Sequence, residues 1–223
     1  MGMGSERPAV RSASSSSEAL INIAATCQAT RALGPGTRGV IWVQGCPFHC
    51  PGCIAPDWVP MRPARLVSAG DLAEEILQDP QVRGLTISGG EPMLQAAGLS
   101  QLVRLVKHKR DVDVICFTGF RIEQLRKTPP GPGVEQFLRE IDVLVDGPYI
   151  EKLNNNAGLR GSANQRILHL TDRLSALELE KTSRQVEIQL SDGQVMLVGI
   201  PPLGIREAFT RAMDQANAAW GAR

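Results

Sequence analysis

The chain alternates short apolar runs with amphipathic helical stripes along most of its length. Each apolar run is too short and too rich in β-branched residues to be a helix, so it predicts a buried strand. Stripes with apolar residues at helical spacing follow these runs and predict helices, the first of them capped by Ser68. Strands that alternate with helices indicate βαβ units and one parallel sheet. The predicted strands span residues 40–43, 85–88, 112–117 and 141–145, and the predicted helices span 68–78, 99–110 and 121–127.

The two ends of the chain differ from this central pattern. Residues 1–18 are rich in serine and lack an apolar stretch, so we expect a disordered tail, with a single domain over residues 19–223. Residues 20–24 alternate and predict an edge strand. Two further alternating runs, about 185–190 and 195–198, predict a β-hairpin, and an amphipathic stripe from 205 to about 219 predicts a last helix.

Length and composition narrow the class of protein. With 223 residues the chain has room for a sizeable core, and 43% apolar and 21% charged residues are ordinary for a globular protein. The formal net charge of +1 gives no sign of a nucleic-acid or membrane partner, and no apolar stretch approaches the length of a membrane span. The odd count of five cysteines, without a signal-peptide pattern, favours a reducing compartment, so we expect a cytoplasmic protein.

Three of the cysteines share one short loop. Cys46, Cys50 and Cys53 have C-x3-C-x2-C spacing and directly follow the first predicted strand. In β/α proteins the carboxyl ends of the strands are where the chemistry collects. A [4Fe–4S] cluster normally takes four protein thiolates, so a cluster held by three would leave one iron open to a small molecule.

Two other interpretations of these cysteines remain open. A zinc site could use His49 or Cys27 as a fourth ligand, although zinc motifs usually come as two separated ligand pairs. The thiols could also be idle. Cys116 lies inside an apolar run, where we expect a buried small hydrophobe rather than a ligand.

Polar residues and glycines mark the ends of the next three predicted strands. Ser88, Gly89, Gly90 and Glu91 follow the second strand, and the two glycines would let the backbone approach a ligand closely. Thr118 ends the third strand, where a contact to a ligand and a tight turn are equally plausible.

The fourth strand is followed by a carboxylate and a polar stretch. Asp146 at its end would face the same pocket as the thiols if the strands close into a barrel. Residues 149–165 cannot carry a core and predict a functional loop or lid. Arg160 and Arg166, at the end of this stretch, could clamp a carboxylate or serve only solubility.

Taken together, these motifs resemble the radical S-adenosylmethionine superfamily. The likeness rests on the order of Gly34–Arg38, a strand, the cysteine triplet and Ser88–Pro92, and it runs from about Gly34 to about Leu170. Within the superfamily the chain is most similar to activating enzymes of glycyl-radical enzymes, nearest to the branch that activates anaerobic ribonucleotide reductase. The motifs of that branch are Cys50-Pro51-Gly52-Cys53, Phe117–Phe120, Asp142–Gly147 and Arg160–Arg166.

The resemblance implies a fold and a site. The fold is α/β, a partial, open β/α barrel of radical S-adenosylmethionine type, extended here by the tail and by the C-terminal hairpin and helix. Cys46, Cys50 and Cys53 would hold a [4Fe–4S] cluster, with no further catalytic side chain. The implied contacts to S-adenosylmethionine are Gly52, Ile54, Ser88, Gly89, Gly90, Glu91, Thr118, Asp146 and Arg160.

The resemblance also implies an activity and partners. The reduced cluster would cleave S-adenosylmethionine to a 5′-deoxyadenosyl radical, which takes a hydrogen from a glycine of a partner enzyme. Flavodoxin or ferredoxin would supply the electron. Two alternatives remain open: a radical S-adenosylmethionine enzyme that modifies a small molecule or peptide directly, and a zinc-binding module without catalysis.

Overall fold

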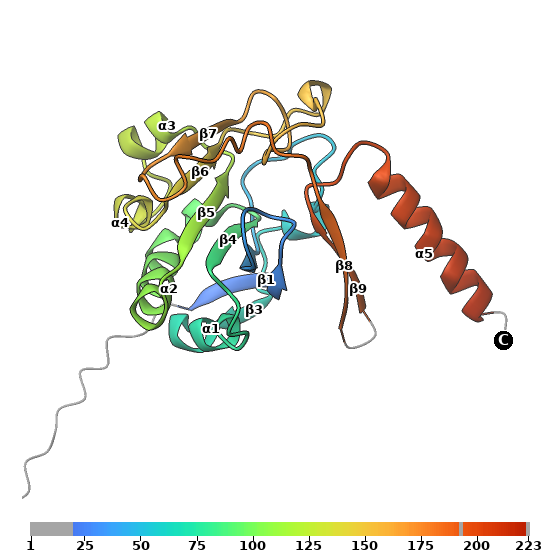
Figure 1. Ribbon diagram of the computed structural model, residues 1–223, viewed down its shortest axis with the longest axis horizontal. Coiled ribbons are helices and arrows are strands. Elements are labelled where there is room, and N and C mark those ends of the chain that lie inside the picture. The colour runs from blue at the N-terminus through green and yellow to red at the C-terminus, as the bar shows by residue number, and fades with distance from the viewer. Residues whose placement is uncertain (1–19, 192–193, 222–223) are drawn as a thin grey trace, which may run out of the picture.

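The computed structural model describes residues 20–191 and 194–221. The predicted tail at 1–18 and the tip of the predicted hairpin lie outside the described residues, and the single domain over 19–223 stays a prediction. Figure 1 shows one large sheet with helices along it, and beyond it a two-stranded ribbon and a long C-terminal helix.

The large sheet has seven strands in the order β3-β1-β2-β4-β5-β6-β7. Its centre is four parallel strands, which are those the apolar runs predicted, and antiparallel strands flank them on both sides. The sheet stays open, with β3 and β7 as its edges, which agrees with the predicted open α/β fold. The strands are β1 (Ile21–Thr30), β2 (Arg38–Val43), β3 (Arg65–Val67), β4 (Gly84–Gly89), β5 (Asp113–Thr118), β6 (Val143–Asp146) and β7 (Arg166–His169).

Helices cover one face of this sheet (Figure 1). Ser68 begins the first of them by accepting a hydrogen bond from the Asp71 backbone N–H, as its pattern predicted. Along β5, Val114 and Cys116 point into the core under the helices, whereas Ile115 points to the other face, as strand alternation requires. The helices are α1 (Ala69–Ile76), α2 (Ala96–Lys109), α3 (Ile122–Lys127) and α4 (Val134–Leu138), with short 3₁₀ turns η1 (Pro56–Trp58), η2 (Pro92–Gln95) and η3 (Glu151–Leu153).

The prediction of an edge strand near residue 20 was wrong. β1 is ten residues long and lies between β2 and β3, so the edge position belongs to the three-residue β3. The sequence pattern could not predict this arrangement, because the second half of β1 is made of small and polar residues and because β3 is too short to show an alternating pattern.

The other face of the sheet is covered by the chain that follows β7. Leu174 and Leu179 pack against Ile115, Val143 and Val145 on this face. The predicted hairpin forms as β8 (Val186–Ser191) and β9 (Gln194–Gly199), a separate two-stranded sheet that packs on β1 and β2 rather than joining the large sheet.

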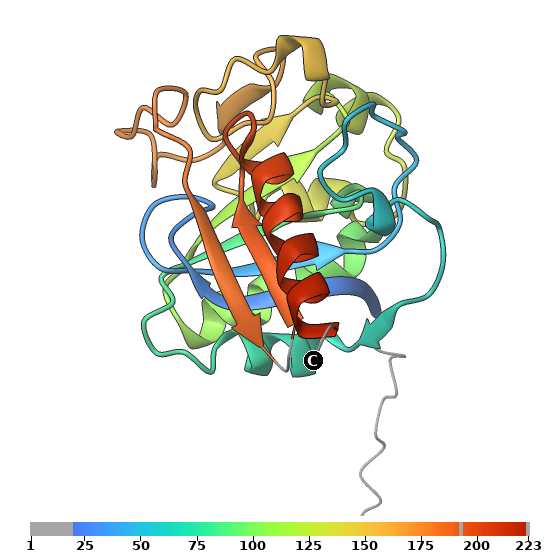
Figure 2. The same cartoon turned by 90° about the vertical axis from the view of Figure 1, so that its right-hand side faces the viewer.

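The last helix, α5 (Ile205–Gly221), follows the hairpin and lies in front of it in the view of Figure 2. Its bounds are close to those that the apolar stripe predicted. No helix among the described residues is long and apolar enough to cross a membrane.

A buried arginine ties the amino ends of the central strands together. Arg38 is 0% exposed and pairs with Asp113 at 2.6 Å. Its guanidinium also donates to Thr86 Oγ1 at 2.7 Å and to the Leu85 carbonyl at 2.6 Å. A buried charge is tolerated only when paired and hydrogen-bonded, and Arg38 meets both conditions at the start of β2, β4 and β5.

Candidate functional site

A cavity of about 280 Å³ opens at the carboxyl ends of the parallel strands. Cys46, Cys50 and Cys53 all line it, so the three thiols share one hollow as their spacing predicted. The same cavity is lined by most of the contacts that the resemblance implied for S-adenosylmethionine: Gly52, Ile54, Ser88, Gly89, Gly90, Glu91 and Thr118.

The cysteine loop is held in place by backbone hydrogen bonds. The N–H groups of Gly45 and Cys46 donate to the carbonyls of Trp58 and Val59 at 2.8 and 2.9 Å, and within the loop the Cys53 N–H donates to the Cys50 carbonyl at 3.1 Å. These bonds fix the chain on both sides of Cys46, so the thiols are presented by an ordered loop.

Burial makes the free thiolates unfavourable. It raises the pKa of Cys46 to about 11, and burial is also the main cause of the raised pKa of Cys50. Thiolates in such a place need a strong positive charge beside them, which bound iron supplies.

The geometry of the cysteines also separates a cluster from a zinc ion. A single zinc needs its ligands around one point, and no group of three His, Cys, Asp or Glu side chains within residues 20–191 and 194–221 is placed that way. A cluster takes each thiolate on a different iron, and here all three thiols line one cavity. Cys27 and Cys116 are buried in two separate apolar clusters and do not line the cavity, so neither is placed to add a ligand.

The two glycines after β4 let this strand end lie directly against the cysteine loop. The Gly90 N–H donates to the Val43 carbonyl at 2.7 Å, and the Glu91 N–H donates to the Gly45 carbonyl at 2.8 Å. A Cβ on Gly90 would lie 2.3 Å from the Gly45 carbonyl oxygen, and one on Gly89 would lie 2.5 Å from the Val43 nitrogen. The glycines are therefore needed for backbone packing as well as for an open cavity wall.

Glu91 is buried, and its carboxylate is occupied by the protein. It accepts hydrogen bonds from the Met93 N–H at 3.0 Å, from Thr118 Oγ1 at 2.7 Å and from the Gly119 N–H at 2.8 Å. Burial outweighs these bonds and raises the pKa of Glu91 to about 7. The side chain joins the ends of β4 and β5, and its predicted contact with S-adenosylmethionine stays a prediction.

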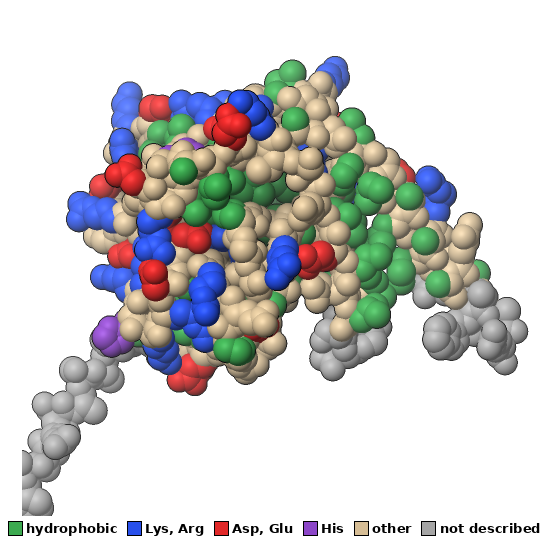
Figure 3. Space-filling view, viewed as in Figure 1, with side chains coloured by type: hydrophobic (Ala, Val, Ile, Leu, Met, Phe, Trp, Pro, Cys, Tyr) green, Lys and Arg blue, Asp and Glu red, His purple; other side chains and the backbone are tan. Residues whose placement is uncertain are grey.

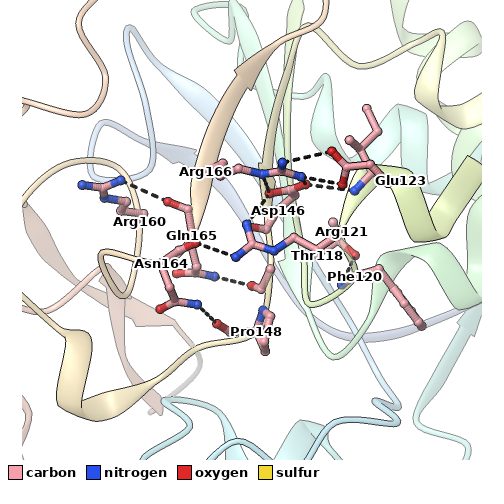
Figure 4. A network of polar contacts seen from close by, with 12 residues as sticks. Thr118, Phe120, Arg121, Glu123, Asp146, Pro148, Arg160, Asn164, Gln165 and Arg166 are labelled. Atoms are coloured by element: carbon pink, nitrogen blue, oxygen red, sulfur yellow. Dashed lines mark hydrogen bonds and ion pairs between the residues drawn. The ribbon is translucent and has the colours of Figure 1, made fainter.

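Asp146 belongs to an ion-pair network beside the cavity and not to its wall, contrary to the expectation that it faces the thiols. Its carboxylate accepts from Arg121 Nη1 at 3.1 Å, from the Ile122 N–H at 2.9 Å and from Arg166 Nε at 2.9 Å (Figure 4). Burial alone would raise the pKa of Asp146, but these donors outweigh it and hold the pKa below its usual value. Arg166 also pairs with Glu123 at 2.8 Å, so the carboxylates that it clamps belong to this chain.

Arg160 is the other implied contact that does not line the cavity. Its Nη1 donates to the Gln165 carbonyl at 3.0 Å, and Figure 4 shows it apart from the carboxylates of Asp146 and Glu123. The predicted contacts of Asp146 and Arg160 with S-adenosylmethionine would therefore need a rearrangement.

No sequence motif marks the C-terminal part of the opposite wall. Residues 199–204, where the hairpin leads into α5, line the cavity together with Arg206 and Glu207, and Arg206 Nη1 donates to the Cys53 carbonyl at 3.3 Å. Asn154 and Arg184 also line it. Because these residues are far from the cysteines in sequence, only the folded chain brings them to the site.

The family comparison decides what this cavity is. The family described as "4Fe-4S single cluster domain" matches residues 32–168, which include all three cysteines and the Gly-Gly loop. The chain belongs to this family. As in the other radical S-adenosylmethionine members, the cofactors are the [4Fe–4S] cluster and S-adenosylmethionine, which rules out the zinc-module alternative.

Similar proteins indicate which type of enzyme within the family this chain is. It is 31% identical over 144 residues to the anaerobic ribonucleoside-triphosphate reductase-activating protein of Enterobacteria phage T4, covering 62% of this chain and 88% of the relative. The protein of that name from Vibrio cholerae is 34% identical over 148 residues, covering 62% and 91%. The pyruvate formate-lyase-activating enzyme of Staphylococcus aureus is 29% identical over 157 residues, covering 65% and 59%. The chain is thus an enzyme of the activating type, and residues 169–223 lie beyond the family match.

Proposed function

We propose that this chain activates a partner enzyme by taking a hydrogen from a glycine of that enzyme. The names of the relatives support a reductase of the anaerobic ribonucleotide type as the partner. The observation that carries the proposal is the single cavity that the three cysteines share with the Gly-Gly loop.

The residues of this chain bind and shield the reacting molecule. Cys46, Cys50 and Cys53 would hold the cluster, and the backbone of Gly89 and Gly90 would face the amino-acid end of S-adenosylmethionine. When bound, cluster and S-adenosylmethionine supply the 5′-deoxyadenosyl radical. Trp58 lines the cavity and packs on Trp42 with ring centroids 5.6 Å apart, and this apolar wall keeps water from the radical.

The proposal also includes an electron donor for the cluster and a cellular location. We expect flavodoxin or ferredoxin as donor, in the cytosol. Cys27 and Cys116 lie in apolar clusters away from the cavity, so neither is placed to extend an electron path through the chain.

Two measurements test this function. Anaerobically reconstituted, reduced protein is incubated with S-adenosylmethionine and with the anaerobic ribonucleotide reductase of the same organism, and 5′-deoxyadenosine and the glycyl-radical electron paramagnetic resonance signal are recorded. We expect both products, with the radical on the reductase. Formation of 5′-deoxyadenosine without any radical on the reductase would contradict the activase assignment and favour direct modification of a small molecule or peptide, for which residues 199–204 supply a wall from this chain's own C-terminal part.

A further inference from the structure

Two neighbouring arginines beside the cavity have no acidic partner. Within residues 20–191 and 194–221, neither Arg160 nor Arg184 forms an ion pair, whereas Arg121 and Arg166 nearby do. The Nε atoms of Arg160 and Arg184 are both buried without a hydrogen-bond partner. A half-buried guanidinium that lacks a carboxylate is costly unless a ligand supplies the negative charge.

Arg184 is the one of the two that reaches the cavity. Its Nη1 donates to Asn154 Oδ1 at 2.8 Å, and its Nη2 donates to the carbonyls of Arg160 and Gly161 at 2.7 and 3.0 Å. These acceptors are neutral and fix the planar guanidinium at the cavity wall without neutralising it. The side chain is therefore already oriented before any ligand arrives.

Two of the three carboxylates that line the same cavity are engaged elsewhere. Glu91 is held by three donors, Glu207 lies 3.9 Å from Arg206, and Glu151 lies beside Gly52. Arg160 adds a second positive charge behind Arg184, and burial together with this neighbour lowers the pKa of Arg184. This part of the wall thus favours an anion.

We propose that Arg184, oriented by Asn154, binds the α-carboxylate of S-adenosylmethionine in this cavity. At neutral pH the carboxylate is the one anionic group of that molecule, and the positive charge and the remaining Nη1 N–H of the Arg184 guanidinium can pair with it. The inference rests on the proposed function, because it requires S-adenosylmethionine as ligand. Arg184 lies beyond residues 32–168, so this contact comes from the part of the chain that the family match leaves out.

Equilibrium binding to the anaerobically reconstituted protein tests the contact without turnover. The ligands are S-adenosylmethionine and its decarboxylated analogue, and the variants are Arg184→Gln and Arg184→Lys. Arg173→Gln is the matched control, because Arg173 has its own partner in Asp111 at 2.9 Å. Arg184→Gln is expected to weaken S-adenosylmethionine binding by about 10–100-fold and to leave the analogue unchanged, since a hydrogen-bonded charge pair contributes that much. Arg184→Lys keeps the charge and should lose less affinity for S-adenosylmethionine than Arg184→Gln. The control should bind both ligands as the wild type does.

The outcomes separate a carboxylate contact from a structural brace. Equal loss of both ligands in Arg184→Gln would mean that Arg184 only holds the loop at residues 154–161, and unchanged binding of both would mean that it does nothing for the ligand; either result overturns the inference. If Arg184→Gln fails to retain its iron, Arg184→Lys decides, because a carboxylate contact requires a lower preference for S-adenosylmethionine over the analogue than in the wild type. A wild type that cleaves S-adenosylmethionine while these variants bind it normally would refute the role of Arg184 and leave the proposed function intact.

Discussion

The two walls of the cavity are built in opposite ways. The wall made by β2, β4 and their loops presents the three cysteines and the Gly-Gly loop on strand ends that backbone hydrogen bonds hold together, and it lies within the family match. The opposite wall comes from residues 154–207, among them the polar Asn154, Arg184 and Arg206. Beyond it the hairpin exposes Ile188 and Leu190 by 60% and 76%, and apolar side chains gather where the hairpin faces α5 (Figure 3).

This difference indicates a division of labour. Positioning a cluster and a small molecule requires fixed backbone geometry, which glycines at close approach provide. Choosing a ligand group or a partner can be left to side chains, which change without disturbing the sheet. The predictions below test this division, beginning with the largest effect.

Cys50→Ser should abolish both the cluster and the cleavage of S-adenosylmethionine, because one of three thiolates is lost from the cavity. The measurements are iron and sulfide content, the visible absorbance and the yield of 5′-deoxyadenosine. Cys27→Ala is the control, since Cys27 is buried beneath the hairpin and outside the cavity, and it should keep its iron. Iron retained by Cys50→Ser would contradict the assignment of the ligands.

Arg38→Met should lower the free energy of unfolding by about 3–5 kcal/mol, because Asp113 and two carbonyls lose their buried partner. Urea denaturation measures the loss. Arg139→Gln breaks an exposed pair with Glu135 and should cost less than about 1 kcal/mol. Similar losses in the two variants would show that the buried pair is not what ties the strands together.

Glu91 should make stability depend on pH. The folded chain keeps the proton of Glu91 up to about pH 7, whereas the unfolded chain releases it near 4.5, so the free energy of unfolding should fall as pH rises through this window and then level off. The loss should be on the order of 3 kcal/mol at most. Denaturation of wild type and Glu91→Gln across this range measures it, and an equal slope in the two would refute the assignment to Glu91.

Gly90→Ala should cost about 1–3 kcal/mol and reduce iron retention, because the added methyl group meets the Gly45 backbone, which cannot move without shifting the cysteine loop. Gly131→Ala is the matched control, as its Cβ would meet only ordinary contacts at 3.6 Å. Both proteins are compared by thermal unfolding and iron analysis. If Gly90→Ala keeps the thermal stability and the iron content of the wild type, the two strand ends do not need this close approach.

Leu190→Gln should change the free energy of unfolding by less than about 0.5 kcal/mol, because the side chain is mostly exposed on the hairpin. Urea denaturation and the oligomeric state in solution are the measurements. A clear loss of stability would mean that this face of the hairpin is covered in solution, and the second wall would then be as fixed as the first.

The sequence by itself determined the parts that depend on local pattern. Short β-branched runs gave β2, β4, β5 and β6 because each is buried on both faces, and the carboxyl ends of parallel strands necessarily bring the cysteines and the Gly-Gly loop to one edge. The cap at Ser68 and the C-terminal hairpin could also be predicted, because each depends on residues that are close together in the sequence.

Only the tertiary structure decided where the polar side chains point and what closes the cavity. Asp146 turns to Arg121 and Arg166, and Arg184 reaches the cavity from a loop that no motif marks. β1 lies inside the sheet because a three-residue strand far along the chain pairs with it. Each of these depends on contacts between distant segments, and such contacts are selected by the packing of the whole chain rather than by the residues next to them.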